Sequence, residues 1–290
     1  MDAGSRHVAT VSGTVMKLYR TQNGLLLRSG EAFFPLGALT IDDLINHADL
    51  KHYLESGAAQ GRTVSAPQDE DLLAPVGTQE IWASGVTYER SREGRKEEAK
   101  EAGGGDFYSR VYQAERPELF FKACGWRAVG PGDKIRIRAD SKWSVPEPEL
   151  VLVINNSGSI VGYTVGNDVS SRDIEGENPL YLPQAKVYDR SCAIGPCILV
   201  SDQPLSRSTG IEMAIERDGR VCYSGTTTLA QMKRSAESLV KYLTQELSFP
   251  AGVMLFTGTG IVPPSDFRLQ SGDTVKITIP PIGELVNEVE

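Results

Sequence analysis

Apolar residues alternate with polar ones, or run together, in a series of short segments from Pro117 onward. These segments predict successive β-strands with the sequences ELFFKA, KIRIRA, EPELVLVI, SIVGYTVG, CAIGPCILV, IEMAIER, GVMLFTG and DTVKITI. The turn signal NNSG at 155–158 predicts that EPELVLVI and SIVGYTVG pair as a hairpin. One helix is predicted over 228–247, where apolar residues recur at helical spacing.

The beginning of the chain has a separate pattern. VATVSGTVMKLYR, the turn QNG and GLLLRSG predict a hairpin. Thr40 and Asp43 have the spacing of a capping box that begins a helical stretch, and Gly57 is expected to end it. Prolines and acidic residues over 65–77 predict a linker. We therefore expect a small N-terminal α/β domain with its linker over 1–75 and a larger catalytic domain over 76–290.

The larger domain is predicted to begin with the strand IWASGVTY and a very polar helix that ends at GGG over 103–105. Most of this helix is so rich in charged residues that we expect it to face solvent. Its first turn, which contains Ser91 and Arg92, follows the end of the strand and is expected to reach a site there. Strands and helices do not alternate regularly, which argues against a Rossmann fold or a TIM barrel. The predicted class is α+β, built on mixed β-sheets.

Composition limits the function. The chain has 290 residues, 40% of them hydrophobic, and a net charge of −8, which disfavours nucleic acid or an anionic membrane as a partner. No segment has the roughly 18 consecutive apolar residues of a membrane-spanning helix, and the start lacks the apolar core of a signal peptide. A cytoplasmic protein with a small-molecule partner is expected. Because no histidine follows His52, chemistry in the larger domain must use carboxylates, lysine, tyrosine or a metal.

Two glutamates open the strand EPELVLVI, and Asp168 ends its predicted hairpin partner. Glu147 and Glu149 share one face of the strand, roughly 7 Å apart, where like charges repel unless a cation or a proton lies between them. Three carboxylates without a soft ligand favour Mg²⁺, with Mn²⁺ and Ca²⁺ satisfying the same ligand set. The alternative is a solvated strand end with three unrelated acids.

The sequence EPELVLVINNSGSIVGYTVGNDVSSRD, with GVTY upstream and TGTGIVPPSDFRLQSGDTVKI downstream, resembles the fumarylacetoacetate hydrolase superfamily. The resemblance covers about 81–290. It implies a mixed β-sandwich roll, a Mg²⁺-type ion held by Glu147, Glu149 and Asp168, and a homodimer or homotetramer. Hydrolases of this family activate water with a histidine after GxNY, whereas this chain has Ser91 at that position.

Two further segments, RPELFFKA and IEGENPLYLPQAKVYDRSCAIGP, resemble those of 2-keto-3-deoxy sugar-acid dehydratases. By this resemblance Glu118 and Lys186 carry the acid and base work, and Thr259 in the TGTG turn contacts a substrate carboxylate. Ser91, Arg92 and Lys122 are expected to line the substrate site.

The resemblance implies that a 2-oxo acid substrate, bound to the metal, loses its C3 proton to Glu118. Its C4 hydroxyl then leaves as water, and Lys186 protonates that hydroxyl or holds the carboxylate. The expected product is 2-oxoglutarate semialdehyde. Two alternatives stay open: a C–C hydrolase or decarboxylase acting on an acylpyruvate or diketo acid, and a non-catalytic sugar-acid binding protein.

Overall fold

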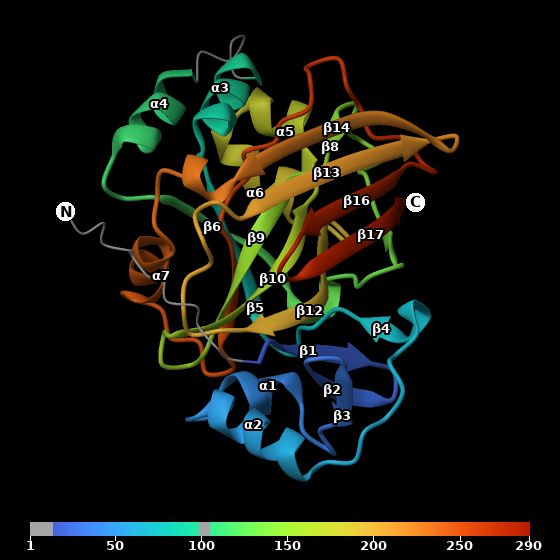
Figure 1. The fold of residues 1–290 in the computed structure, drawn as a ribbon. Coiled ribbons are helices and arrows are strands. Elements are labelled where there is room, and N and C mark those ends of the chain that lie inside the picture. The colour runs from blue at the N-terminus through green and yellow to red at the C-terminus, as the bar shows by residue number, and fades with distance from the viewer. Residues whose placement is uncertain (1–13, 99–104) are drawn as a thin grey trace, which may run out of the picture.

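A computed structural model describes residues 14–98 and 105–290 (Figure 1). Its largest sheet has ten strands. In spatial order these are β3 (Ala32–Pro35), β2 (Gly24–Ser29), β1 (Met16–Thr21), β12 (Cys192–Val200), β10 (Ile160–Asp168), β9 (Pro148–Ile154), β15 (Val253–Phe256), β5 (Glu80–Gly85) and β6 (Glu118–Cys124), with β4 (Leu72–Leu73) paired to β1. All pairs are antiparallel except β15 with β5.

A second sheet packs against the first. Its five strands, in spatial order, are β14 (Arg220–Thr228), β13 (Gly210–Arg217), β16 (Thr274–Ile279), β17 (Gly283–Val289) and β7 (Lys134–Ile135). A two-stranded ladder joins β8 (Ser144–Val145) to β11 (Ser170–Ser171). The helices are α1 (Ile41–Ile45), α2 (Leu50–Gln60), α3 (Glu89–Glu98), α4 (Gly105–Gln113), α5 (Arg172–Glu177), α6 (Leu182–Lys186) and α7 (Ala236–Thr244).

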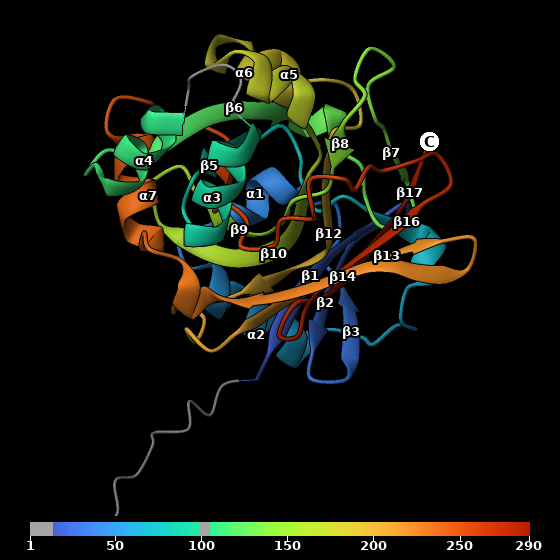
Figure 2. The same cartoon turned by 90° about the horizontal axis from the view of Figure 1, so that it is seen from above.

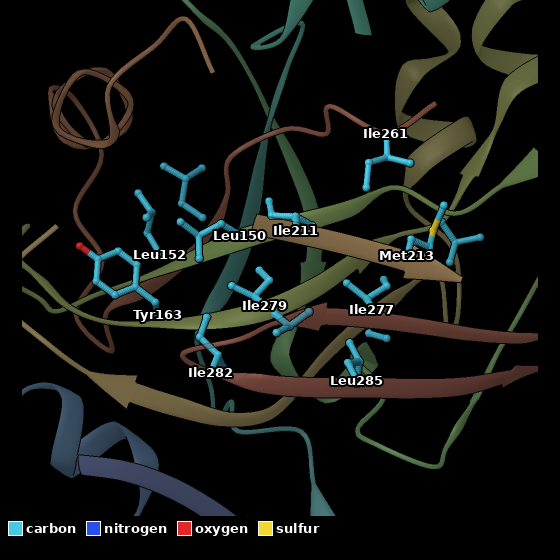
Figure 3. Packing of buried hydrophobic residues seen from close by; sticks show 14 of the residues in the cluster. Leu150, Leu152, Tyr163, Ile211, Met213, Ile261, Ile277, Ile279, Ile282 and Leu285 are labelled. Carbon is cyan, nitrogen blue, oxygen red and sulfur yellow. The ribbon is translucent and has the colours of Figure 1, made fainter. Parts of the chain in front are cut away.

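Strand β9 lies at the centre of the hydrophobic core. Every residue of PELVLVI is buried, as expected for a continuous apolar strand covered on both faces. Leu150 and Leu152 point toward the second sheet, where Figure 3 shows them with Ile211, Met213 and Ile277. The alternate residues of β9 pack in a separate cluster with α1 and α2. This double burial fixes the start of β9, where the carboxylates lie.

Several expectations are confirmed. The hairpin of β9 with β10 forms, and so does that of β1 with β2. Thr40 and Asp43 make a capping box at the start of α1. In the part of the chain that the structure describes, no helix is long and apolar enough to cross a membrane.

Other boundaries were predicted wrongly. Helix α2 continues past Gly57 to Gln60, because glycine is tolerated in an exposed helix at a modest cost. The predicted helix over 228–247 forms only as α7, since Thr228 belongs to β14 and Ser235 provides the N-cap. KIRIRA keeps only two residues in a strand. The segment 65–77, predicted as a linker, includes β4.

Two further predictions lie partly outside the described residues. The first strand was expected to begin before residue 14, and the polar helix was expected to reach the glycines at 103–105. Helix α3 is described as far as Glu98, and Gly105 opens α4, a helix that the sequence pattern did not predict. The division at residue 75 stays a prediction, although β1 and β12 pair within one sheet.

Candidate active site

The β9–β10 hairpin brings three carboxylates together. Gly166 lies opposite Glu149 in the ladder, and the Asp168 backbone N–H donates to the Glu147 carbonyl at 2.9 Å. All three side chains are buried, and one oxygen of each lies within 4.8 Å of the others. The structure therefore places Glu147, Glu149 and Asp168 in the arrangement that the sequence predicts for a metal site.

Buried cations surround two of these acids. The Lys186 Nζ donates to the Glu147 Oε2 at 2.7 Å and to the Asp168 Oδ2 at 2.9 Å. The Lys122 Nζ lies 2.6 Å from the Asp168 Oδ1, and the Arg172 Nη2 donates to the Glu147 Oε1 at 2.5 Å. In the described part of the chain, Glu149 forms no ion pair, and its Oε2 accepts a hydrogen bond from the Gly258 N–H at 2.5 Å.

The pKa values of these groups reflect this asymmetry. Burial alone would raise the pKa of Glu147, but Lys186 and Arg172 hold it below the usual range. Burial, Asp168 and Glu147 together raise the pKa of Glu149 well above its usual value. Burial opposes the charge on Lys186, yet the neighbouring Asp168 and Glu147 raise its pKa. Glu149 is thus the carboxylate with the least compensation for its charge.

The cluster of three carboxylates, Glu147, Glu149 and Asp168, fits a divalent ion. Its ligand atoms are all hard oxygens, which suit Mg²⁺, Mn²⁺ and Ca²⁺. The oxygens already bonded to Lys186 keep further acceptor capacity, because each carboxylate oxygen has two lone pairs. Glu149 forms no ion pair among the described residues and accepts one hydrogen bond from the Gly258 N–H, so a bound cation would compensate its charge in place of a proton.

Glu118 enters the site from the first residue of β6. Glu118 lies opposite Gly85 of β5. Any side chain at position 85 would overlap Glu118, because a Cβ there would lie 2.0 Å from the Glu118 Oε2. That oxygen is buried without a hydrogen-bond partner among the described residues. Burial raises the pKa of Glu118, and Arg95 is the strongest opposing influence. A carboxyl group in this state is suited to accept a proton.

A small cavity of about 10 Å³ lies between the three carboxylates and Lys186; it is lined by Ser84, Gly85, Val86, Ser91, Arg95, Phe120, Glu147, Glu149, Asp168, Lys186, Gly258 and Thr259. Of the residues predicted to bind substrate, the structure places Ser91 and Thr259 in this lining. The Ser91 Oγ donates to the Tyr88 carbonyl at 2.7 Å, and the Thr259 Oγ1 donates to the Ile261 carbonyl at 3.2 Å.

The structure places the other two predicted substrate ligands elsewhere. Arg92 pairs with Glu89 and stacks over the Tyr112 ring, outside the cavity lining. Lys122 is fully buried behind Asp168, and its Nζ also donates to the Lys186 carbonyl at 2.6 Å. These contacts suit a structural role for Lys122, in which it fixes the Asp168 side chain and the end of α6.

Two buried charged residues were missed from the sequence. Arg95 lines the cavity, and its Nη1 contacts the Glu175 Oε1. Arg95 was assigned to a solvated helix, but it follows Ser91 by four residues, and i,i+4 positions share a helix face. That spacing was the available signal. Glu175 stands in α5, and nothing in the local pattern distinguishes it from Glu177, which is exposed.

A cluster of buried carboxylates, lysines and arginines at the end of a mixed β-sandwich defines the active site of a divalent-metal enzyme. The family model described as "Fumarylacetoacetate (FAA) hydrolase C-terminal" matches residues 80–290. The protein therefore belongs to the fumarylacetoacetate hydrolase family. The resemblance found in the sequence and the expected α+β fold are both confirmed.

Two curated relatives are similar to this chain over most of its length. A probable 2-keto-3-deoxyxylonate dehydratase of Haloferax volcanii is 53% identical over 222 residues, which cover 76% of this chain and 75% of the relative. A 2-dehydro-3-deoxy-D-arabinonate dehydratase of Saccharolobus solfataricus is 45% identical over 224 residues, covering 77% and 75%.

A solved structure extends the similarity to nearly the whole chain. It is a 2-keto-3-deoxy-D-arabinonate dehydratase complexed with magnesium and 2,5-dioxopentanoate. It superposes with a TM-score of 0.80 at 34% identity, covering 96% of this chain and 99% of the other.

Proposed function

We propose that the protein is a Mg²⁺-dependent hydro-lyase. It dehydrates a 2-keto-3-deoxy sugar acid of the 2-keto-3-deoxy-D-arabinonate type to 2-oxoglutarate semialdehyde, which is 2,5-dioxopentanoate. The observation that carries the proposal is the buried Glu118 Oε2, which packs against Gly85 of the cavity wall, beside a cavity that three buried carboxylates and Lys186 line. The dehydratase relatives and the magnesium and product in the solved neighbour support the same activity.

The charge balance around the cavity supports an anionic substrate. The charged side chains around the cavity are the partly buried Glu118, the buried carboxylates Glu147, Glu149, Asp168 and Glu175, and the buried cations Arg95, Lys122, Arg172 and Lys186. With all of them ionised, the carboxylates exceed the cations by one. A bound divalent ion would change the net charge of the site from −1 to +1. The carboxylate of a bound substrate would then bring the net charge to zero. Buried sites with compensated charge avoid a large desolvation penalty.

A bound Mg²⁺ supplies Lewis-acid stabilisation of the charge that develops on the substrate's C2 oxygen. Glu147, Glu149 and Asp168 would hold the ion. The Glu118 carboxylate takes the C3 proton, and its buried position brings its pKa closer to that of the acidified C–H. As the electron pair moves to form the C3–C4 double bond, the C4–O bond breaks and the hydroxyl leaves with a proton as water.

Before the reaction, the Lys186 ammonium group lies between Glu147 and Asp168. From there its ammonium group either gives a proton to the departing hydroxyl or holds the substrate carboxylate; in the second case the hydroxyl takes the proton that Glu118 removed from C3. The enone then loses one proton from C5 and the proton of its C5 hydroxyl, gains one proton at C3 and one at C4, and becomes the semialdehyde. Ser91 and Thr259 line the cavity and are proposed to bind substrate, whereas Lys122 is proposed to hold Asp168 in place.

The main alternative is C–C hydrolysis or decarboxylation of an acylpyruvate or diketo acid. The position of Ser91 weighs against it, because its Oγ is bonded to the backbone of Tyr88 and no imidazole is present beyond His52. A catalytically silent binding protein is the other alternative, and the buried Glu118 Oε2, which has no hydrogen-bond partner among the described residues, weighs against it. A cytoplasmic location and a homodimer or homotetramer stay predictions.

Turnover of two compounds separates these functions. We expect the magnesium-loaded protein to convert 2-keto-3-deoxy-D-arabinonate and to leave an acylpyruvate unchanged. EDTA should stop the reaction, and added Mg²⁺ should restore it. Pyruvate released from the acylpyruvate, without dehydration of the sugar acid, supports the hydrolase. Binding of the sugar acid without turnover in either assay supports the binding protein.

Replacing Gly85 tests whether Glu118 must occupy its observed position. In G85A the new methyl group overlaps the flexible end of the Glu118 side chain, so the carboxyl should move while the fold is kept. We expect kcat to fall by roughly 100-fold, because small displacements of a reacting group have effects of that size. Thermal unfolding should shift little.

The control is G57A in α2, where a Cβ meets no atom within 4 Å. It should leave kcat unchanged and stabilise the protein by about 0.5–1 kcal/mol. Wild-type activity in G85A would show that the position of Glu118 is not critical.

A further inference from the structure

Glu175 is a buried carboxylate at the site with no role in the steps above. Its side chain is 1% exposed, and it lies on α5. It does not belong to the three-carboxylate group that fits a metal. Figure 2 shows α5 and α6 together beside β6, and α5 also contacts α3, which carries Arg95.

Glu175 is shared by three buried cations. Arg95 contacts its Oε1 directly, and the Lys186 Nζ lies 4.0 Å from the same oxygen. The Arg172 Nε lies 4.0 Å from its Oε2, one helical turn away on α5. Glu175 is therefore the acid that joins Arg95 to Lys186 and Arg172.

Each of these cations also faces the reacting region. Lys186 bonds to Glu147 and Asp168, and Arg172 bonds to Glu147. Arg95 lines the cavity and acts electrostatically on Glu118. Like charges at short range repel strongly in a buried region, so removal of the Glu175 charge should drive the three cations apart. Lys186 and Arg95 would then leave the positions from which they act.

We propose that Glu175 is a positioning residue for the dehydration, holding Arg95 at the cavity wall and Lys186 between Glu147 and Asp168. The inference rests on the proposed function. It assigns Glu175 no contact with the substrate or the metal. Its loss should therefore lower the rate of the chemical step more than it weakens the binding of substrate or metal.

The test compares Glu175→Gln, which keeps the shape and removes the charge, with Glu175→Asp, which keeps the charge. Loss of a partner that orients groups at a metal site typically costs 10- to 100-fold. We expect kcat of the Gln variant to fall by roughly that factor. KM for 2-keto-3-deoxy-D-arabinonate and the Mn²⁺ affinity by calorimetry should stay within about threefold. The Asp variant should lie between the Gln variant and the wild type, since its charge remains nearby.

Glu177→Gln is the matched control, because Glu177 is exposed on the same helix; it should leave kcat unchanged. Wild-type kcat in Glu175→Gln overturns the proposal, and so do equal losses in the Gln and Asp variants. If Glu175→Gln does not fold, Arg95→Lys tests the same pair: reduced kcat supports the role, and wild-type kcat overturns it. Failure of the proposed function is distinguishable, because the wild type itself would then not dehydrate the sugar acid.

Discussion

Replacement of Glu118 by glutamine is expected to lower kcat for dehydration by about 1,000-fold, within the range usual for a general base. Glutamine has nearly the same shape but cannot accept the C3 proton. Because Glu118 is outside the metal-ligand group, the variant should still bind Mn²⁺ and the sugar acid. Steady-state kinetics and calorimetry on the same preparation measure both effects. Stability should not fall, since a buried and unpartnered carboxyl oxygen is removed.

The exposed Glu115, three residues earlier, provides the control for Glu118. Glu115→Gln removes the same charge from the approach to β6 and should keep wild-type kcat. Near wild-type turnover in Glu118→Gln would assign the base to another residue. Loss of Mn²⁺ binding in that variant would make Glu118 a metal ligand instead.

Replacement of Glu149 by glutamine is expected to abolish metal-dependent stabilisation and turnover together. Glu149 carries the least compensated charge of the three carboxylates, so a divalent ion should interact with it strongly. At a Mg²⁺ concentration about 100 times Kd, the wild type should gain about 2.7 kcal/mol of stability from binding. The variant should gain almost none, because its affinity should fall by more than about 100-fold.

Thermal melts in EDTA and in Mg²⁺ show this difference directly. Without metal, the Glu149→Gln variant should be at least as stable as the wild type, because a buried carboxyl that is raised in pKa by Asp168 and Glu147 has been neutralised. Glu212→Gln, at an exposed position on β13, should respond to Mg²⁺ like the wild type. An unchanged Mg²⁺ response in Glu149→Gln would remove Glu149 from the ligand set.

Much of the fold could be predicted because the buried strands have clear patterns. The apolar run of β9, the turn after it and the strand β10 were enough to place Asp168 near Glu147 and Glu149. Strands β14 and β17 lack that clarity: β14 is largely exposed at a sheet edge, and β17 alternates with acidic residues. Helix α4 packs against α3, and such tertiary contacts are not encoded in local propensity.

The site was only half predictable for a related reason. Glu118 and Lys186 were assigned by resemblance, since neither residue has a distinctive local pattern. Arg95 and Glu175 come from α3 and α5, and their contact exists only because the fold packs those helices together. Arg92 was expected at the site because it is near the strand end, but its side chain pairs with Glu89 and stacks over the Tyr112 ring. Which charged residues of a polar helix become buried is decided by packing.

The most direct test of the central claim is to follow 2-keto-3-deoxy-D-arabinonate by proton NMR with the magnesium-loaded wild-type protein. The proposed function predicts that the substrate signals disappear while the aldehyde proton of 2,5-dioxopentanoate appears, with no pyruvate formed, and that EDTA stops this change. Unchanged substrate, or products of carbon–carbon cleavage, would contradict it.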